Sequence, residues 1–235
     1  MNYKGQLLQD KFVLNVLQEK KNGYFLEIGS NHPEEINNSY LLEKEYNWKG
    51  IMVEYENKWL NSYKQQRPNS IHIINDATKV NYKKILEENN FPNKLDYLQI
   101  DLEANNGSTL ETLIKLDKEI LDTYTFATVT FEHDIYHTNY MNTREMSRKI
   151  FEKRNYVRVF GDVCCAITGR PVEDWYIHPT LVNSDLISNL INKNKQNHKN
   201  IWGDWINGEL YNRKFPSQGE LPVINETISY KDIIY

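Results

Sequence analysis

The chain has 235 residues, enough for one sizeable hydrophobic core, and 26% of them are charged. Its 28 basic and 32 acidic side chains leave a formal net charge of −4, so no overall positive field attracts nucleic acid. No run of about 18 apolar residues occurs, and the first residues lack the apolar core of a signal peptide. Composition therefore disfavours nucleic-acid-binding and membrane proteins and predicts a cytoplasmic domain.

Short apolar runs alternate with helix-like segments along the chain. Apolar residues at helical spacing predict a first helix over 6–20. Strands are then predicted at 24–28, 50–53, 71–74, 95–100, 126–131 and 156–163, and helices at 36–46, 57–66, 82–89, 109–116 and 144–154. Whether 172–177 adds a last strand, or Gly161-Asp162 turns a tight hairpin instead, stays open. The alternation predicts an α/β fold with a mostly parallel sheet and helices on both faces.

The pattern changes after Pro179. Residues 192–200, NKNKQNHKN, are polar, whereas 201–235 contain two Trp and several Tyr. We therefore expect one α/β domain over 1–180 and an extension over 181–235 that packs on it.

The cysteines, Cys164 and Cys165, are neighbours and lack the spaced partners of a zinc site. We expect both to be free thiols, as in a reduced compartment. Frequent Asn, Lys and Ile indicate an AT-rich genome, such as that of a low-GC bacterium or a large DNA virus.

Acidic residues follow the predicted strands at the point where each one ends. They are Glu27, Glu54, Asp76, Asp101 and Glu132. Because the carboxyl ends of parallel strands line one crevice, we expect these side chains to face a common ligand. A helix N-cap is the commoner role for any one such acid, but five together favour the crevice.

The turn after the first strand, GSNHPE, begins at Gly29 and lacks the further glycines of a dinucleotide fingerprint. Glu54 follows Gly29 by 25 residues, near the roughly 20 expected for an acid that binds ribose hydroxyls. A ligand with a ribose but no phosphate fits this pattern, and S-adenosylmethionine is such a ligand.

Several ordered motifs give the chain a family resemblance. The runs GQLLQDKFVLNVL, GYFLEIGSN, WKGIMVE, NDAT and LDYLQIDLE resemble the FkbM family of S-adenosylmethionine-dependent methyltransferases over roughly residues 5–180. The resemblance implies a Rossmann-like class I methyltransferase fold with seven strands, the last antiparallel. It also implies O-methylation of a hydroxyl, often on a sugar or natural product.

The resemblance also implies roles for individual residues. Those matched to cofactor binding are Gln9, Asp10, Glu27, Gly29, Asn31, Glu54, Asp76, Ala77 and Asp101. The acidic pair of the IDLE motif is Asp101 and Glu103. Ala104 stands where the family usually has glycine, so the cofactor half of the resemblance is better supported than the substrate half.

Two mechanisms remain open for removing the acceptor's proton. His133 titrates near neutrality and is a candidate general base, together with Asp101 and with Glu132 or Asp134 to orient it. Alternatively, a divalent metal bound by Asp101, Glu103, Glu132 and Asp134 lowers the pKa of the hydroxyl, and magnesium, calcium or manganese suits such oxygen ligands. Glu173, Asp174 and Trp175 are candidates for the acceptor pocket, although Trp is more often a core residue.

The leading hypothesis is an S-adenosylmethionine-dependent O-methyltransferase acting on a hydroxyl of a glycan or other small molecule. The alternatives are an enzyme of other chemistry on the same cofactor, and a methyltransferase-like binding module without activity. Neither a nucleic acid nor a membrane is expected as partner, and the sequence says nothing of the oligomeric state.

Overall fold

The computed structural model describes residues 2–135, 141–164, 171–183, 185, 186 and 188. Its strands are β1 (Tyr24–Ile28), β2 (Lys49–Glu54), β3 (Ile71–Ile74), β4 (Lys94–Ile100), β5 (Thr125–Glu132), β6 (Val157–Cys164) and β7 (Pro171–Ile177). Its α-helices are α1 (Gln9–Val16), α2 (Tyr40–Tyr46), α3 (Leu60–Gln66), α4 (Tyr82–Glu88), α5 (Ser108–Glu119) and α6 (Met141–Lys153). Short 3₁₀ helices are η1 (Asn57–Trp59), η2 (Ala77–Lys79) and η3 (Ala104–Asn106).

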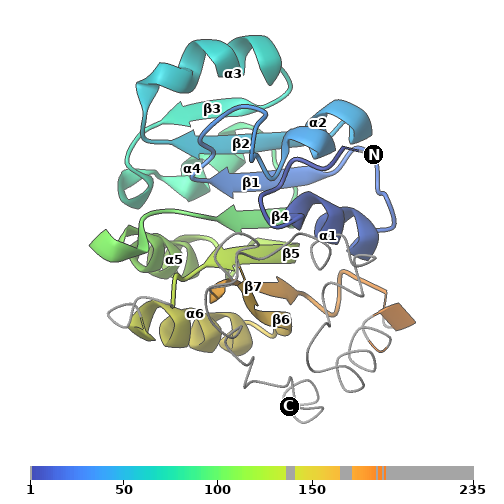
Figure 1. The fold of residues 1–235 in the computed structure, drawn as a ribbon, viewed down its shortest axis with the longest axis vertical. Coiled ribbons are helices and arrows are strands. Elements are labelled where there is room, and N and C mark those ends of the chain that lie inside the picture. Colours follow the sequence, from blue (N-terminus) through green and yellow to red (C-terminus); the bar gives the residue numbers. More distant parts are fainter. Residues whose placement is uncertain (1, 136–140, 165–170, 184, 187, 189–235) are drawn as a thin grey trace, which may run out of the picture.

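The strands form one seven-stranded sheet in the order β3-β2-β1-β4-β5-β7-β6 (Figure 1). The neighbours from β3 to β5 pair in parallel, whereas β7 is antiparallel to both β5 and β6. The predicted mostly parallel sheet with one antiparallel strand is confirmed. The segment that the sequence left open, 172–177, belongs to β7.

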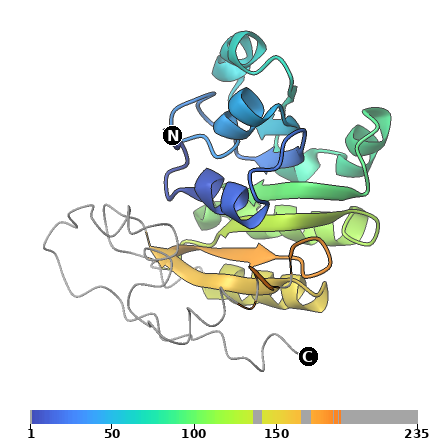
Figure 2. The same ribbon diagram turned by 90° about the vertical axis from the view of Figure 1, so that its right-hand side faces the viewer.

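Helices cover both faces of the sheet, as predicted (Figures 1 and 2). One apolar cluster packs under α4, α5 and α6, and the other packs under α1, α2 and α3. Successive strand side chains alternate between these two cores, so Leu26 and Ile28 lie in the first while Phe25 lies in the second. We call the two sides the α5 face and the α1 face.

Several expectations fall partly or wholly outside the described residues. Cys165 and nearly all of the predicted extension over 181–235 are among them. Val182 and Leu186 are described, and both pack against the cluster on the α1 face. Within the described part of the chain, no helix is both long enough and apolar enough to cross a membrane.

A buried polar network holds the loop between β1 and α2. The Arg67 network, as we call it, consists of Glu27, Asn37, Ser39, Glu43 and Arg67. The Arg67 guanidinium donates to Glu43 (2.8 Å), Asn37 (2.8 Å) and Ser39 (2.7 Å), and the Ser39 hydroxyl donates to Glu27 (2.8 Å). This network fixes the loop, and α2 begins at Tyr40 instead of residue 36.

Removing the arginine should test how much the fold depends on this network. Because Arg67→Ala leaves the buried carboxylates of Glu27 and Glu43 without their cation, we expect it to lower the free energy of unfolding by about 3–5 kcal/mol. Urea denaturation measures this change. Lys64→Ala, at an exposed position of α3, is the control and should change stability by less than about 0.5 kcal/mol. Equal stability of the two variants would contradict the argument.

Candidate active site

The order of the strands makes the carboxyl ends of β1 and β4 the place where an open α/β sheet is expected to form its ligand crevice. The chain runs outward from β1 through β2 to β3 and then returns to β4 on the other side of β1, so the connections diverge at this point. Gly29 ends β1 with a φ of +88°, and a Cβ placed there would lie 1.8 Å from the Asp101 carbonyl oxygen. Only glycine fits this close approach, which explains the sequence break after β1.

Glu54 ends β2 next to this crevice. Its Oε2 accepts a hydrogen bond from the Asn31 backbone N–H (2.7 Å), and its Oε1 accepts one from the Glu56 N–H (2.8 Å). Each oxygen keeps a second lone pair, so the oriented carboxylate has acceptor capacity left for a ligand's hydroxyls. Tyr55, which the sequence analysis did not single out, is 76% exposed beside it and offers an aromatic face to a flat ring. The sequence feature that could have identified Tyr55 is an aromatic residue directly after the acid that ends a strand.

Three residues assigned to cofactor binding by the resemblance are buried with partners inside the protein. Glu27 belongs to the Arg67 network, and burial raises the pKa of its carboxyl although Arg67 opposes the shift. Asp10 accepts from the backbone N–H groups of Lys4 and Lys11, and burial raises its pKa to about 6. Gln9 donates to Glu173 (2.8 Å). These contacts give the three residues structural roles, and their contact with a cofactor stays a prediction.

Asp76 and Ala77 form the turn after β3. The Asp76 carboxylate caps η2 by accepting from the Thr78 backbone N–H (3.0 Å) and pairs with Lys79 (2.8 Å). Hydrogen bonds from Lys79 and Thr78 lower its pKa to about 2. The carboxylate therefore shapes the turn, while Ala77 is buried behind it.

Three carboxyl groups from adjacent strands meet on the α1 face at the carboxyl end of β4 and β5. Asp101 follows β4, Glu132 ends β5, and Glu173 of β7 lies directly opposite Glu132 in the antiparallel register. We call these residues the acid trio. The pKa of Glu132 is raised well above its usual range. The largest cause is burial, and the charge of Asp101 and a hydrogen bond between the two carboxyl groups add to it. Burial and the Asp101 charge do the same for Glu173.

The arrangement of this sheet matches known structures. The methyltransferase domain of METTL16 superposes with a TM-score of 0.50 at 12% sequence identity, covering 72% of this chain and 65% of that domain. The chain has the class I methyltransferase fold. Because the sequence identity is only 12%, this structural similarity establishes the fold alone.

Two further structures show weaker similarity. A TehB-like SAM-dependent methyltransferase from Corynebacterium glutamicum has a TM-score of 0.44 at 9% identity, over 72% of this chain and 87% of that one. Fibrillarin from Aeropyrum pernix, with natively bound S-adenosyl-L-methionine, has a TM-score of 0.45 at 11% identity, over 74% of this chain and 75% of that one. No family model and no curated protein matches the sequence.

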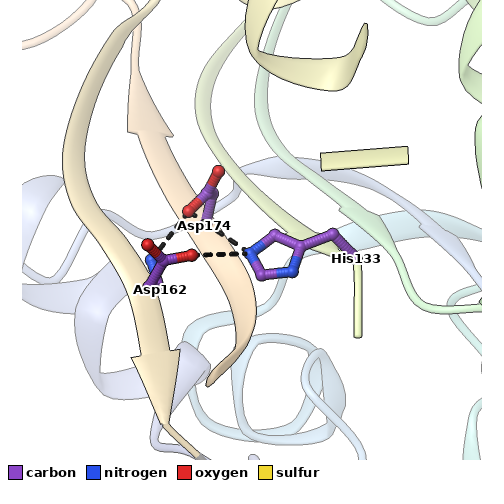
Figure 3. A group of neighbouring side chains, drawn as sticks. All are labelled: His133, Asp162 and Asp174. Atoms are coloured by element: carbon purple, nitrogen blue, oxygen red, sulfur yellow. Dashed lines mark hydrogen bonds and ion pairs between the residues drawn. The ribbon is translucent and has the colours of Figure 1, made fainter. Parts of the chain in front are cut away.

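The prediction that His133 borders the crevice as a general base is wrong. Its side chain is 0% exposed and lies on the opposite, α5 face, because consecutive strand residues point to opposite sides of the sheet. Its Nε2 points at Asp162 (3.5 Å) and Asp174 (3.4 Å), as Figure 3 shows, and its Nδ1 accepts from the Ile135 N–H. Neither ring nitrogen faces the acid trio.

Arginines of α6 complete this group, which we call the Arg148 cluster: His133, Arg144, Arg148, Asp162 and Asp174. Arg148 donates to Asp174 (2.7 Å) and to Asp162 (3.1 Å), and Arg144 pairs with Asp162. Burial opposes ionisation of Asp174, yet His133 and Arg148 hold the pKa of its carboxyl well below its usual range. The cluster joins α6 to β6 and β7 in the methyltransferase fold.

The predicted metal site does not form in this geometry. In the parts of the chain that the structure describes, the one group of three potential ligands within 4.8 Å of one another is His133, Asp162 and Asp174. Arg144 and Arg148 already neutralise those carboxylates, so a divalent cation would compete with two guanidinium groups. Glu103, one of the predicted ligands, is exposed at the start of η3, outside the acid trio.

The raised pKa values predict how stability depends on pH. Since the folded state holds protons on Glu132 and Glu173 at pH values where the unfolded chain has released them, their contribution to stability is complete below the ordinary glutamate value of 4.5. It is lost as pH rises through the folded-state pKa. We therefore expect Glu132→Gln and Glu173→Gln each to flatten this decline, by up to about 1.4 kcal/mol per pH unit.

Urea denaturation at a series of pH values measures these slopes. Glu45→Gln is the matched control, because it removes an exposed acid in the last turn of α2. It should keep the wild-type slope. Unchanged slopes in the Glu132 and Glu173 variants would show that both groups ionise normally in the folded protein.

Proposed function

We propose that the chain is an S-adenosylmethionine-dependent O-methyltransferase that acts on a hydroxyl of a glycan or other small molecule. The observation that carries this proposal is the juxtaposition of the Gly29 turn with the acid trio at the point where the connections diverge. A cofactor site and a proton-accepting group are thereby next to each other.

The residues at the crevice fit this cofactor. Glu54 is positioned to accept the ribose hydroxyls, and exposed Tyr55 to cover the adenine ring. Gly29 allows the Asp101 backbone to approach β1 closely, and Asn31, with a φ of +47°, donates its backbone N–H to Glu54 and so orients that carboxylate. When bound, S-adenosylmethionine supplies a methyl group already activated by the sulfonium charge.

Asp101 and Glu132 supply the proton acceptor in this proposal. A hydroxyl acceptor has to lose its proton as its oxygen forms the new bond, and the hydrogen-bonded carboxyl pair lies where two parallel strands end. The raised pKa makes Glu132 a stronger base than an ordinary carboxylate once it is ionised. The same carboxyl groups, with the net charge of −4, disfavour a polyanionic acceptor such as nucleic acid.

Calorimetric titration with S-adenosylhomocysteine tests the cofactor half. Glu54→Gln keeps the shape of the side chain but removes its charge, so we expect a loss of roughly 2–3 kcal/mol in binding free energy. Glu45→Gln, which changes an exposed acid in the last turn of α2, should bind like the wild type. If the wild-type protein gives no heat at millimolar ligand, the proposal is wrong.

A screen of sugars and other hydroxyl compounds with labelled S-adenosylmethionine tests the catalytic half. With any acceptor that is methylated, Asp101→Asn and Glu132→Gln should each lower kcat by about 100-fold or more, and Glu132→Gln should do so with unchanged affinity for S-adenosylhomocysteine. Because His133 faces the Arg148 cluster, His133→Gln should change stability more than it changes kcat. The reverse ranking would restore His133 as the base.

A further inference from the structure

Arginine neutralises two groups of buried acidic side chains in the described part of the chain. Those two are the Arg67 network and the Arg148 cluster. The acid trio, in which Glu173 is buried and Asp101 and Glu132 are half-buried, makes no ion pair with any Lys or Arg of that part; the amide of Gln9 donates to Glu173. Ionised carboxyl groups this close repel one another, and the trio has no cation of the kind that the other two groups have.

A buried hydrogen-bond acceptor without a partner, next to the trio, is an independent indication of a ligand. Gln99 is 2% exposed, and its Oε1 has no hydrogen-bond partner within the described residues. It lies on the α1 face, one pleat before Asp101, between Glu27 and Thr130 in the register of the sheet. The Thr130 hydroxyl is already bonded to the Tyr97 hydroxyl (2.7 Å), and Glu27 belongs to the Arg67 network. Gln99 therefore lies beside the acid trio on the same face, with an acceptor oxygen that no described residue satisfies.

Once ionised, the carboxyl groups of the trio offer only hydrogen-bond acceptors, and the unpartnered atom of Gln99 is an acceptor as well. A primary ammonium group has three donors and no acceptor, which complements carboxyl oxygens together with an amide oxygen. We propose that the acid trio and Gln99 bind a cationic amino group of the methyl acceptor, so that the substrate is an amine-bearing hydroxyl compound of the amino-sugar class. This inference rests on the proposed function and specifies its substrate.

The charge of the site would then determine which methyl-acceptor substrates bind well. An ammonium group supplies the missing cation and allows Glu132 and Glu173 to release the protons that they hold in the free protein. A neutral sugar leaves the mutual repulsion in place, and an anionic sugar adds to it. No covalent bond changes in this recognition step.

Three sugars of similar size and different charge test the proposal. With the protein saturated by S-adenosylhomocysteine, so that the cofactor site is filled, glucosamine, glucose and glucuronate are titrated by calorimetry or ligand-observed NMR at pH 7. We expect glucosamine to bind at least about tenfold more tightly than glucose, and glucuronate more weakly than glucose.

Variants connect this preference to the trio. Glu173→Gln should reduce the preference for glucosamine over glucose to about threefold or less, without changing the affinity for S-adenosylhomocysteine. Gln99→Leu should weaken glucosamine binding in the same direction. Glu45→Gln, which changes an exposed acid in the last turn of α2, should keep the wild-type preference.

The outcomes separate this inference from the function on which it rests. Failure to bind S-adenosylhomocysteine would refute the proposed function itself. Normal binding of that ligand with no preference for glucosamine, whether all three sugars bind equally or none binds, would overturn the amino-group inference alone. Binding of Mg²⁺ or Mn²⁺ that Glu132→Gln and Glu173→Gln abolish, without a preference among the sugars, would also overturn it and assign the trio to a metal.

Discussion

The close approach of the Gly29 and Asp101 backbones determines the geometry of the carboxyl edge of the sheet. Because a Cβ at Gly29 would meet the Asp101 carbonyl, β1 and β4 can end side by side only with glycine at this position. Glu54 after β2 and Asp101 after β4 are thereby held on either side of the end of β1. The proposed separation of roles follows from this contact, with the cofactor toward β2 and the acceptor toward β5.

Electrostatic compensation distinguishes structural acids from candidate functional ones. The acids of the Arg67 network and the Arg148 cluster are buried with arginines at hydrogen-bonding distance, and each group joins separate elements of the fold. Such groups stabilise one arrangement of the chain, because removing the cation leaves a buried charge unpaired. The acid trio has no such cation in the described part of the chain, and two of its members have raised pKa values. Perturbed groups of this kind, next to a crevice, are candidates for chemistry rather than for stability.

The mistaken role of His133 has a simple geometric cause. Glu132 and His133 are adjacent in sequence, at the end of β5, and both were expected beside Asp101. Extended backbone sends neighbouring side chains to opposite faces, so Glu132 joins the acid trio while His133 joins the Arg148 cluster. The same alternation separates Glu173 from Asp174 on β7. Alternation along a strand was readable in the sequence and would have placed these residues on different sides.

The sequence by itself determined the order of the strands along the chain, the parallel character of the sheet and the acids at the strand ends, because apolar periodicity and turn residues are local properties. The bounds of β1 and β3 agree with the prediction, since apolar runs between polar turns mark them sharply. Only the tertiary structure decided which acids meet which partners. Arg67 is linked to Glu27, which is far from it in the chain, through the Ser39 hydroxyl, and Glu173 meets Glu132 through antiparallel pairing that no local pattern specifies. Burial and charge pairing depend on such distant contacts, so they separated the structural carboxylates from those proposed to act on a substrate.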